Sequence, residues 1–420
     1  MGAMQTVEAL PPYDVVVLGA GYAGLMAALR LGRRKFGLRI ALVSASDHFL
    51  ERVRLQETIV NAVAPRIPSI AALVEGTPIT FVAGRVVSID AAQRRVRLAT
   101  QAGEQEIAFE QAIYALGSTI EVEAVAGVAM HAYRLEACEG PRSAVALRAR
   151  LNANGARRLR VVVVGGAETA VEAAGEIKTA WPAAEVSMVS RSRCGAFKGA
   201  RVEESIRAAL TRLGVMLIDD ETVAEVRADA VVTVAGRSIP CDICVWSGGL
   251  ATAPLARAAG IATDPRGRVF VDPNLRSISH PHIRAIGDAA HPIAPTGAPY
   301  RLSAFAALAT GAYVADAVAA ERRGRKLRPF AFSTFGQGIA IGRRGVGLFS
   351  YPDDQQRFFL VTDKTARHIR NFFVWLVCAV LRMERKMPGS FFWLGKRRVS
   401  WQTANEAMQN GPASRKAQAA

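Results

Sequence analysis

Residues 14–24 read Asp-Val-Val-Val-Leu-Gly-Ala-Gly-Tyr-Ala-Gly, and this stretch decides the fold. Its first five residues form a short apolar run rich in β-branched side chains, which predicts a buried parallel strand. The run leads directly into a G-x-G-x-x-G turn, and residues 25–31 that follow have helical character. A second apolar run, residues 39–44, completes a strand–helix–strand unit. We therefore expect a Rossmann-like nucleotide-binding unit at the start of the chain.

The chemistry of nucleotide binding needs each glycine of this turn for a separate reason. Gly19 permits the tight turn, Gly21 lets the backbone approach a pyrophosphate, and Gly24 lets the helix pack closely on the strand. The free N–H groups and the positive dipole end of the helix then face the phosphates. Ser44 stands where such units usually place an acidic residue for the ribose, and Asp47 follows shortly after. The predicted cofactor-binding residues of this unit are Gly19, Ala20, Gly21, Tyr22, Ala23, Gly24 and Ser44.

A second nucleotide turn is predicted from residue 160 onward. The apolar run 160–164 leads into Gly165, Gly166 and Ala167, and we expect a helix through Glu176 and then a strand over 185–189. Alanine stands at the second and third glycine positions of the fingerprint. At the third position alanine is an accepted variant, whereas at the second the methyl group of Ala167 would crowd a pyrophosphate.

Two arginines follow this last strand. Arg191 and Arg193 lie where a site selective for NAD would place a carboxylate. Guanidinium groups suit a 2′-phosphate, so Arg191 is predicted to contact the nucleotide and the pair favours NADPH. The alternative is that both arginines are ordinary exposed charges of a loop.

Two nucleotide turns about 145 residues apart do not fit a dehydrogenase with a single cofactor. They fit a flavoprotein in which the first turn binds FAD and the second brings in the nicotinamide. Such a protein needs a further flavin contact from the C-terminal half of the chain. The segment 268–272, followed by 283–290 with Gly287 and Asp288, is the candidate for that contact.

Together these motifs resemble the flavoproteins with two dinucleotide-binding domains in the pyridine nucleotide-disulfide oxidoreductase superfamily. The type II NADH dehydrogenase-like group looks closest. The segments that carry the resemblance are the first turn, residues 114–118, the second turn with Glu172 and residues 175–176, residues 246–249, and residues 285–288.

The resemblance implies a role for several residues. Asp288 would hold the ribityl chain of FAD, with Ala115, Gly117 and Gly287 beside the cofactor. Glu172 would lie near the nicotinamide as the positioning group of the catalytic site, and its alternative is an ordinary carboxylate in the first turns of a helix. Arg54 would contact the flavin or an FAD phosphate, and its alternative is a surface salt bridge. A helix starting near residues 300–301 would aim its N-terminus at the flavin.

The predicted fold class is therefore α/β, with two interleaved Rossmann-like domains for FAD and NAD(P), a C-terminal cap and a basic amphipathic segment. The FAD domain is expected to be split into residues 1–118 and 250–330. The NAD(P) domain would cover residues 119–249, and the cap, membrane-facing segment and flexible tail would cover residues 331–420.

The expected function is that of an FAD-dependent NAD(P)H oxidoreductase. Hydride would pass from nicotinamide C4 to flavin N5, and electrons would then reach a quinone or another small acceptor. Residues 303–311, after Asp288, contain no glutamine, so the quinone contacts of the respiratory enzymes are not carried over. Two alternatives stay open: a flavin enzyme that acts on a specific organic substrate in a biosynthetic pathway, and a flavin-binding protein whose nicotinamide site has decayed.

The cysteines argue against disulfide reduction. The first domain has no cysteine before Cys138, and the pair Cys241 and Cys244 falls on an expected strand, not at a helix N-terminus that would stabilise a thiolate. No second pair completes a zinc site, so no metal is predicted. Five scattered cysteines favour a reducing cytoplasm, and residues 1–12 show no secretory signal.

The C-terminal part of the chain concentrates positive charge. The formal net charge is +17, and from residue 321 onward 19 Lys and Arg residues stand against 6 Asp and Glu. The apolar run 372–381 lies within this basic region. As a helix its ten residues cover only about 15 Å of a ~30 Å hydrocarbon core, so the run cannot span a bilayer.

Aromatic residues interleaved with Lys and Arg suit a helix in the headgroup region of an anionic membrane. We therefore expect residues 364–398 to bind such a surface, on the cytoplasmic face of the membrane. The alternative is a helix buried in the core or in a homodimer interface. Nucleic acid fits poorly, because no recognition motif accompanies the charge. The tail 402–420 is expected to be disordered.

Overall fold

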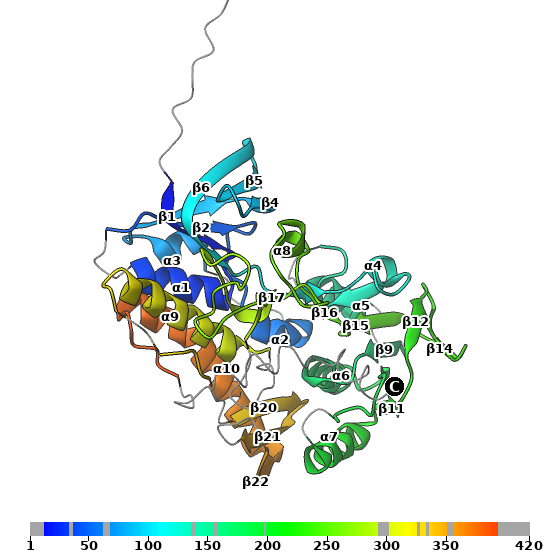
Figure 1. The fold of residues 1–420 in the computed structure, drawn as a ribbon. Helices are drawn as coiled ribbons and strands as arrows, with labels where there is room; N and C mark the ends of the chain where they lie inside the picture. The colour runs from blue at the N-terminus through cyan, green and yellow to red at the C-terminus, as the bar shows by residue number, and fades with distance from the viewer. Residues whose placement is uncertain are drawn as a thin grey trace, which may run out of the picture.

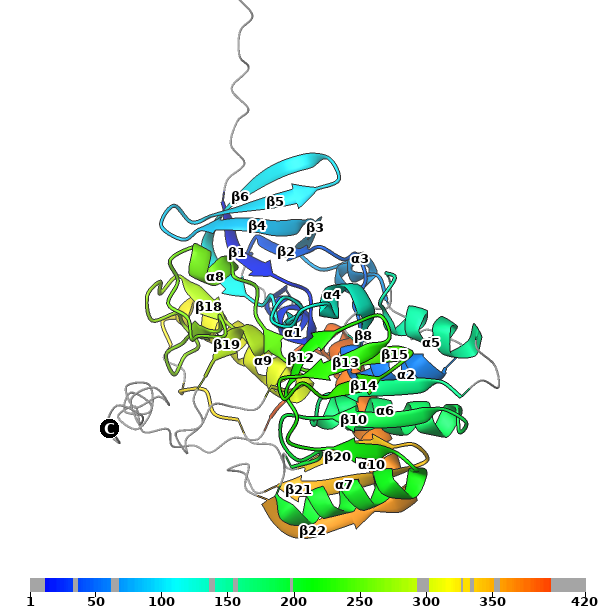
Figure 2. The same cartoon turned by 90° about the vertical axis from the view of Figure 1, so that its right-hand side faces the viewer.

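The computed structural model describes residues 12–32, 37–61, 68–135, 140–153, 158–196, 199–292, 302–325, 328–332, 336–350 and 356–393. Two parallel sheets with their helices form two units, and a third group of elements from the end of the chain packs against both (Figure 1, Figure 2). The predicted α/β class with two dinucleotide-binding units is confirmed.

The first unit is built around β1 (Tyr13–Leu18), which lies between two parallel neighbours. These are β2 (Ile40–Ser44) and the C-terminal half of β6 (Gly103–Tyr114). The strands β3 (Ile79–Ala83) and β18 (Ile283–Ala285) extend the parallel sheet at its two sides. The other half of β6 continues into an antiparallel extension with β5 (Arg95–Thr100) and β4 (Arg85–Asp90). Since β18 comes from far along the chain, this unit is assembled from two separate segments, while the predicted domain boundaries remain predictions.

The second unit repeats the parallel arrangement. Its strand order is β11 (Met216–Ile218), β10 (Glu185–Val189), β9 (Arg160–Val164), β15 (Ile243–Trp246) and β8 (Ala132–Arg134). Its helices are α5 (Ala144–Ala153), α6 (Glu168–Ala180) and α7 (Ala200–Leu213). A small antiparallel sheet of β12 (Val223–Val226), β13 (Ala230–Thr233) and β14 (Ser238–Pro240) lies beside it. The expected strands over 160–164 and 185–189 have these bounds in the structure.

The third group is a short antiparallel sheet and a long helix. The sheet contains β20 (Gly336–Ile341), β21 (Arg344–Ser350) and β22 (Gln356–Thr362), and the helix is α10 (Asp363–Lys386). The strand β20 packs against α6, and α10 packs against β20, β21 and α1 (Tyr22–Gly32). In Figure 1, α10 runs from the β20–β22 sheet toward α9. The C-terminal elements therefore contact both nucleotide units.

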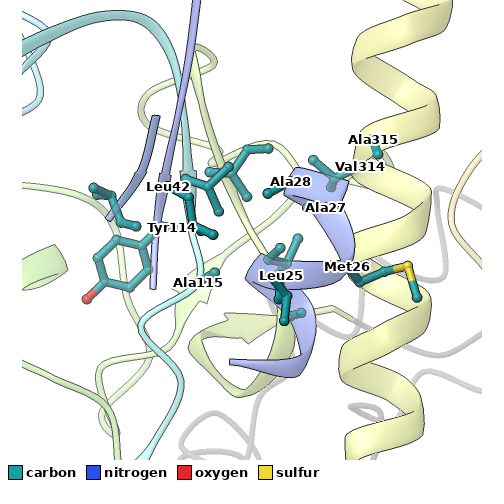
Figure 3. Close-up of a cluster of buried hydrophobic side chains, with 14 of the residues drawn as sticks. Leu25, Met26, Ala27, Ala28, Leu42, Tyr114, Ala115, Val314 and Ala315 are labelled. Atoms are coloured by element: carbon teal, nitrogen blue, oxygen red, sulfur yellow. The ribbon is translucent and has the colours of Figure 1, made fainter. Parts of the chain in front are cut away.

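The core of the first unit is built from apolar side chains of the sheet and of two helices that pack closely on each other. Helix α1 lies between the parallel sheet and α9 (Ala304–Glu321), and Figure 3 shows Leu25 and Met26 of α1 within this layer. A Cβ atom on Gly311 of α9 would lie 2.2 Å from the Ala23 carbonyl oxygen, so only glycine allows this approach of the two helices. The remaining short elements are η1 (Arg52–Arg54), α2 (Leu55–Val60), α3 (Ile70–Val74), β7 (Thr119–Ile120), α4 (Val128–His131), β16 (Leu250–Ala251), α8 (Leu255–Ala258), β17 (Val269–Phe270), η2 (Gly287–Ala289) and β19 (Ala290–His291).

Helix α9 begins later than expected. The sequence predicted a start near residues 300–301, which lie outside the described residues, but the helix begins at Ala304. The Ser303 hydroxyl accepts a hydrogen bond from the Ala306 N–H at 3.1 Å, so Ser303 is the N-cap. Within the described part of the chain, α9 is the one helix with the length and hydropathy of a membrane span, and 72% of it is buried inside the protein.

Candidate cofactor sites

The first glycine turn has the geometry that the fingerprint requires. Gly19 has a φ of +104°, and a Cβ atom there would lie 2.4 Å from the Ala115 carbonyl oxygen. A Cβ atom on Gly24 would lie 1.9 Å from the Gly19 carbonyl oxygen. By contrast, no atom lies within 4 Å of a Cβ built on Gly21. The turn thus closes tightly on its own strands and leaves the Gly21 side open, which fits the approach of a pyrophosphate.

Two further segments converge on this turn. The Ser118 hydroxyl donates a hydrogen bond to the Asp288 carboxylate at 2.7 Å, which joins the segment after β6 to η2. A Cβ atom on Gly287, whose φ is +63°, would lie 3.0 Å from Ala23 Cβ. The structure therefore brings the glycine turn, residues 115–118 and residues 287–288 together at the carboxyl ends of parallel strands, where open α/β sheets bind ligands. A glycine cradle, a helix N-terminus and a carboxylate fit FAD.

The other predicted residues of the first unit lie around this centre. Ala20, Tyr22 and Ala23 are buried, and the Tyr22 ring packs edge-on against Phe49 with 5.1 Å between centroids. Burial, and then the neighbouring Cys378 thiol, raise the pKa of Tyr22 well above its usual range. Gly117 has a φ of +68° and open space around it. Ser44 is the last residue of β2, and its hydroxyl accepts a hydrogen bond from the Ser46 N–H. Asp47, the acidic residue that follows Ser44, is exposed and lies 2.5 Å from the His48 ring nitrogen.

The second glycine turn is held by the strands next to it. A Cβ atom on Gly166 would lie 2.2 Å from the Ser190 hydroxyl oxygen, and one on Gly165 would lie 3.2 Å from the Ser247 carbonyl oxygen. Ala167 is the extended N-cap residue of α6. The residue after Ser190 is the predicted nucleotide contact Arg191, which is exposed beside this turn. The second predicted set therefore also comes together in space.

The two arginines of this loop differ in their contacts. Arg193 pairs with Glu203 of α7, with 2.5 Å between Nε and the carboxylate. Arg191 has no ion pair among the residues that the structure describes. Of the two guanidinium groups, that of Arg191 is the one available to a nucleotide phosphate.

Glu172 lies on α6 and is 5% exposed. Its Oε1 accepts hydrogen bonds from the Ala340 N–H at 2.8 Å and from Arg370 Nε at 3.0 Å. Its Oε2 accepts from Arg370 Nη2 at 3.0 Å and from the Gln56 amide. These four donors match the roughly four lone-pair sites of a carboxylate, so Glu172 is fully engaged by this chain's own groups. The predicted role near the nicotinamide remains a prediction.

Arg54 lines a cavity. It pairs with Glu57 at 3.0 Å and with Glu51 at 3.4 Å, and its side chain is 40% exposed. The cavity has a volume of about 400 Å³ and lies between α2 and α10. Its lining residues are Glu51, Arg54, Glu57, Val60, Asn61, Arg367, Asn371, Val374, Trp375, Cys378 and Arg382. The salt bridge considered as the alternative for Arg54 is present, and the guanidinium also faces this space.

The sequence interpretation missed Arg370, which is 3% exposed. The basic segment was predicted to face a membrane, but Arg370 points into the protein and contacts Glu172 and Glu57. The signal that could have found it is helical spacing, because Arg370, Val377 and Leu381 share one face of α10 and all three are buried. Residues 394–398 of the predicted segment and the tail 402–420 lie outside the described residues.

The cysteine pair is part of an apolar core. Cys244 lies in β15, and Cys241 precedes this strand, so only one of the two is on the expected strand. Both are buried, and burial raises the pKa of the Cys241 thiol to about 11. Burial also raises the pKa of Cys244. Both groups are therefore thiols at neutral pH, which fits small apolar core residues. Cys138 lies outside the described residues.

Comparison with known proteins agrees with this geometry. Residues 13–315 match the family model described as pyridine nucleotide-disulphide oxidoreductase. A demethylphylloquinone reductase from Synechocystis sp. is 25% identical over 347 residues, which cover 80% of this chain and 86% of that protein.

Two solved structures share the fold. One is the sulfide:quinone oxidoreductase of the hyperthermophilic bacterium Aquifex aeolicus, with a TM-score of 0.77, 15% identity, and coverage of 92% of this chain and 98% of that one. The other is NDH2 of Plasmodium falciparum in complex with NADH, with a TM-score of 0.73, 14% identity, and coverage of 95% and 97%. The chain belongs to the pyridine nucleotide-disulphide oxidoreductase family and is an oxidoreductase that uses FAD and NAD(P)H.

Proposed function

We propose that this protein oxidises NAD(P)H and delivers the electrons to a quinone at a membrane surface. Two observations carry the proposal. In the first unit the glycine turn with Gly21 and the carboxylate of Asp288 form one candidate FAD site, and the second unit has a glycine turn of its own at Gly165. The similarity to a demethylphylloquinone reductase supports a quinone as the acceptor. When bound, FAD supplies the redox chemistry, because hydride passes from nicotinamide C4 to flavin N5 and the electrons then leave for the acceptor.

The residues of the chain supply binding and orientation. The N-terminus of α1 presents free N–H groups and a positive dipole end at the open Gly21 side, where a pyrophosphate is stabilised. The carboxylate of Asp288, held by the Ser118 hydroxyl, is placed to accept hydrogen bonds from the ribityl hydroxyls. Arg191 is placed to bind the 2′-phosphate of NADPH. No nucleophile or general base is needed for hydride transfer itself.

The cavity between α2 and α10 is the proposed entry for the acceptor. It combines a flat aromatic ring from Trp375 with N–H donors from Asn371 and Arg382, which suit the ring and the carbonyl oxygens of a quinone. Cys378 lines the cavity and lies beside Tyr22 of the first glycine turn. Cys378 therefore connects the cavity with Tyr22, a residue of the proposed FAD site.

The outward face of α10 is the proposed membrane contact. Its apolar side chains are exposed, with Phe372 at 55%, Trp375 at 61% and Met383 at 41%. Lys364, His368, Arg382 and Lys386 are exposed on the same helix. The opposite face, with Val377, Val380 and Leu381, is buried in the core. A helix that is anchored on one face and carries aromatic and basic groups on the other suits the interface of an anionic bilayer.

The decisive test is anaerobic titration of the purified, FAD-loaded protein with NADH and with NADPH. Bleaching of the flavin absorbance by either nucleotide, and its recovery on addition of a short-chain ubiquinone or menaquinone analogue, is expected. Bleaching without recovery by any quinone would leave a flavin enzyme with another acceptor. Failure of both nucleotides to bleach the flavin would leave a flavin-binding protein, and Ala167 at a fingerprint glycine position would explain it.

Arg191→Ala is expected to raise the KM for NADPH about 10- to 100-fold and to leave the KM for NADH nearly unchanged. The reason is the loss of charge-assisted hydrogen bonds to the 2′-phosphate, each worth roughly 1.5–3 kcal/mol. Steady-state kinetics with both nucleotides measures the effect. The matched control is Arg193→Ala, whose guanidinium is already paired with Glu203. An equal rise in the KM for NADH and for NADPH would contradict the role given to Arg191.

The double variant Phe372→Ser, Met383→Ser is expected to weaken binding to vesicles of mixed phosphatidylcholine and phosphatidylglycerol by at least about 10-fold. Each side chain contributes roughly 1.5–3 kcal/mol when it is fully removed from water. Cosedimentation with the vesicles measures the binding. The matched control is Met216→Ser, Val234→Ser, which changes two apolar residues of the second unit that are more exposed than the α10 pair. Unchanged sedimentation of the α10 variant would remove the membrane contact from the proposal.

A further inference from the structure

Arg370 connects three parts of the molecule through one buried guanidinium. Its Nε and Nη2 donate to the two carboxylate oxygens of Glu172 at 3.0 Å each, which is a bidentate pair with α6 of the second unit. Its Nη1 donates to Glu57 of α2 at 2.5 Å, and α2 packs against α5 and α6 of the second unit. Arg370 itself lies on α10. One side chain of α10 is therefore bonded to carboxylates of α6 and α2, while Val377, Val380 and Leu381 of the same helix are buried in the core of the first unit.

The pair between Arg370 and Glu172 is buried, whereas Glu57 also lines the cavity between α2 and α10. The side chain of Arg370 is 4% exposed, and those of Glu172 and Glu57 are 6% and 17% exposed. Burial alone would lower the pKa of Arg370, but the carboxylates of Glu172 and Glu57 raise it well above its usual range. The guanidinium of Arg370 therefore stays charged at neutral pH.

Backbone packing holds Arg370 in place. A Cβ atom on Gly338 of β20 would lie 2.6 Å from Arg370 Cβ, so α10 lies directly on this strand. A Cβ atom on Gly175 of α6 would lie 2.9 Å from the Gly342 nitrogen, so the same hairpin lies directly on α6. Since glycine alone permits both approaches, α10, the β20–β21 hairpin and α6 form one close-packed body. Arg370 then joins this body to α2.

We propose that Arg370 is a positioning residue for hydride transfer, because it fixes the orientation of α6 and the second glycine turn relative to the first unit. This inference rests on the proposed NAD(P)H reaction. Hydride transfer requires the two rings to lie at near-attack distance, and a displacement of about 1 Å can lower the rate on the order of 100-fold. Glu172 carries this effect to α6 through the bidentate pair, and Glu57 carries it to α2.

The test is stopped-flow reduction of the FAD-loaded enzyme, with the limiting rate calculated per bound flavin. Arg370→Gln removes both ion pairs of Arg370, whereas Glu57→Gln keeps the pair of Arg370 with Glu172 and removes the pairs of Glu57 with Arg370 and Arg54. Both variants are expected to lower the limiting rate roughly 10- to 100-fold while the Kd for the nucleotide changes much less. Arg370→Lys keeps the charge but cannot form the bidentate pair, so only partial rescue is expected. The control is Arg344→Gln, which removes an exposed pair with Asp363 at the start of α10.

A second measurement follows the same residues without turnover. The Ala340 amide donates to Glu172, so its hydrogen exchange reports whether Glu172 is still held. Faster exchange at Ala340 is expected in Arg370→Gln and not in Arg344→Gln. If Arg370 had a purely structural role, its variants would have a lower flavin content or a lower Tm, but their limiting rate per bound flavin would be unchanged. A limiting rate within twofold of the wild type in Arg370→Gln and Glu57→Gln, or unchanged Ala340 exchange in Arg370→Gln, overturns the inference. An unreduced wild-type flavin overturns the proposed function instead.

Discussion

Gly24→Ala is expected to give a protein that is less stable and contains almost no FAD. The added methyl group would lie 1.9 Å from the Gly19 carbonyl oxygen and 3.2 Å from Ala115 Cβ, so the backbone of the turn must move. Overpacking of this kind costs about 1–3 kcal/mol and sometimes more. The displaced turn would also lose its alignment with the phosphates. Thermal unfolding of the apoprotein and the flavin content of purified protein measure the two effects.

Gly21→Ala is the matched comparison, because it adds the same methyl group three residues away in the same turn. No atom lies within 4 Å of that methyl group, so the Tm of the apoprotein should match the wild type. The open side is the one proposed for the pyrophosphate, and a methyl group there would block its approach. We expect FAD affinity to fall by roughly 10- to 100-fold, as for the loss of hydrogen bonds to a charged group. Full retention of FAD in Gly21→Ala would place the cofactor elsewhere.

Arg30→Met is expected to lower the free energy of unfolding by about 3–5 kcal/mol. Arg30 lies on α1, and its Nε and Nη2 donate to the Asp316 carboxylate of α9 at 3.0 Å each. Its Nη1 donates to the Phe391 carbonyl oxygen at 2.8 Å and lies 3.5 Å from Glu384, whose side chain is fully buried. Removing the guanidinium takes this cation away from the fully buried carboxylate of Glu384. Urea unfolding followed by circular dichroism measures the change.

The control for Arg30 is Arg322→Met. Arg322 also pairs with two carboxylates, those of Asp14 and Glu110, but its side chain is 38% exposed. Exposed pairs contribute only about 0–1 kcal/mol, because water screens them. A difference of several kcal/mol between the two variants is therefore expected. Equal values for both would show that the Arg30 network does not hold α1, α9 and the end of α10 together.

The nucleotide units could be predicted from the sequence because their signals are local. A β-branched run followed by glycines specifies both a strand and the turn after it, and β9 and β10 have the predicted bounds. Asp288 could be assigned through the resemblance, and β18 places it beside β6 because parallel neighbours end at the same edge of a sheet. The start of α9 was misplaced because one hydroxyl, that of Ser303, decides where the helix begins.

The buried charges could not be predicted in the same way. Arg370 bonds to carboxylates 198 and 313 positions away, and Arg30 bonds to one 286 positions away. An arginine in a basic, aromatic segment is typical of a surface, and only the tertiary structure supplies the carboxylates that turn it inward. The interpretation of α10 as a surface helix was therefore correct for exposure at Phe372 and Trp375 and wrong for Arg370.

The two-sided nature of α10 has a practical consequence for preparing the protein. Shortening the gene to end before this helix would be the usual route to material that needs no detergent. Here the same cut would remove Arg370, the buried cation paired with Glu172, together with the apolar face of α10, and the shortened polypeptide would be expected to precipitate. Replacing Phe372 with a polar residue keeps the inward face of the helix and is the sounder starting point for crystallisation.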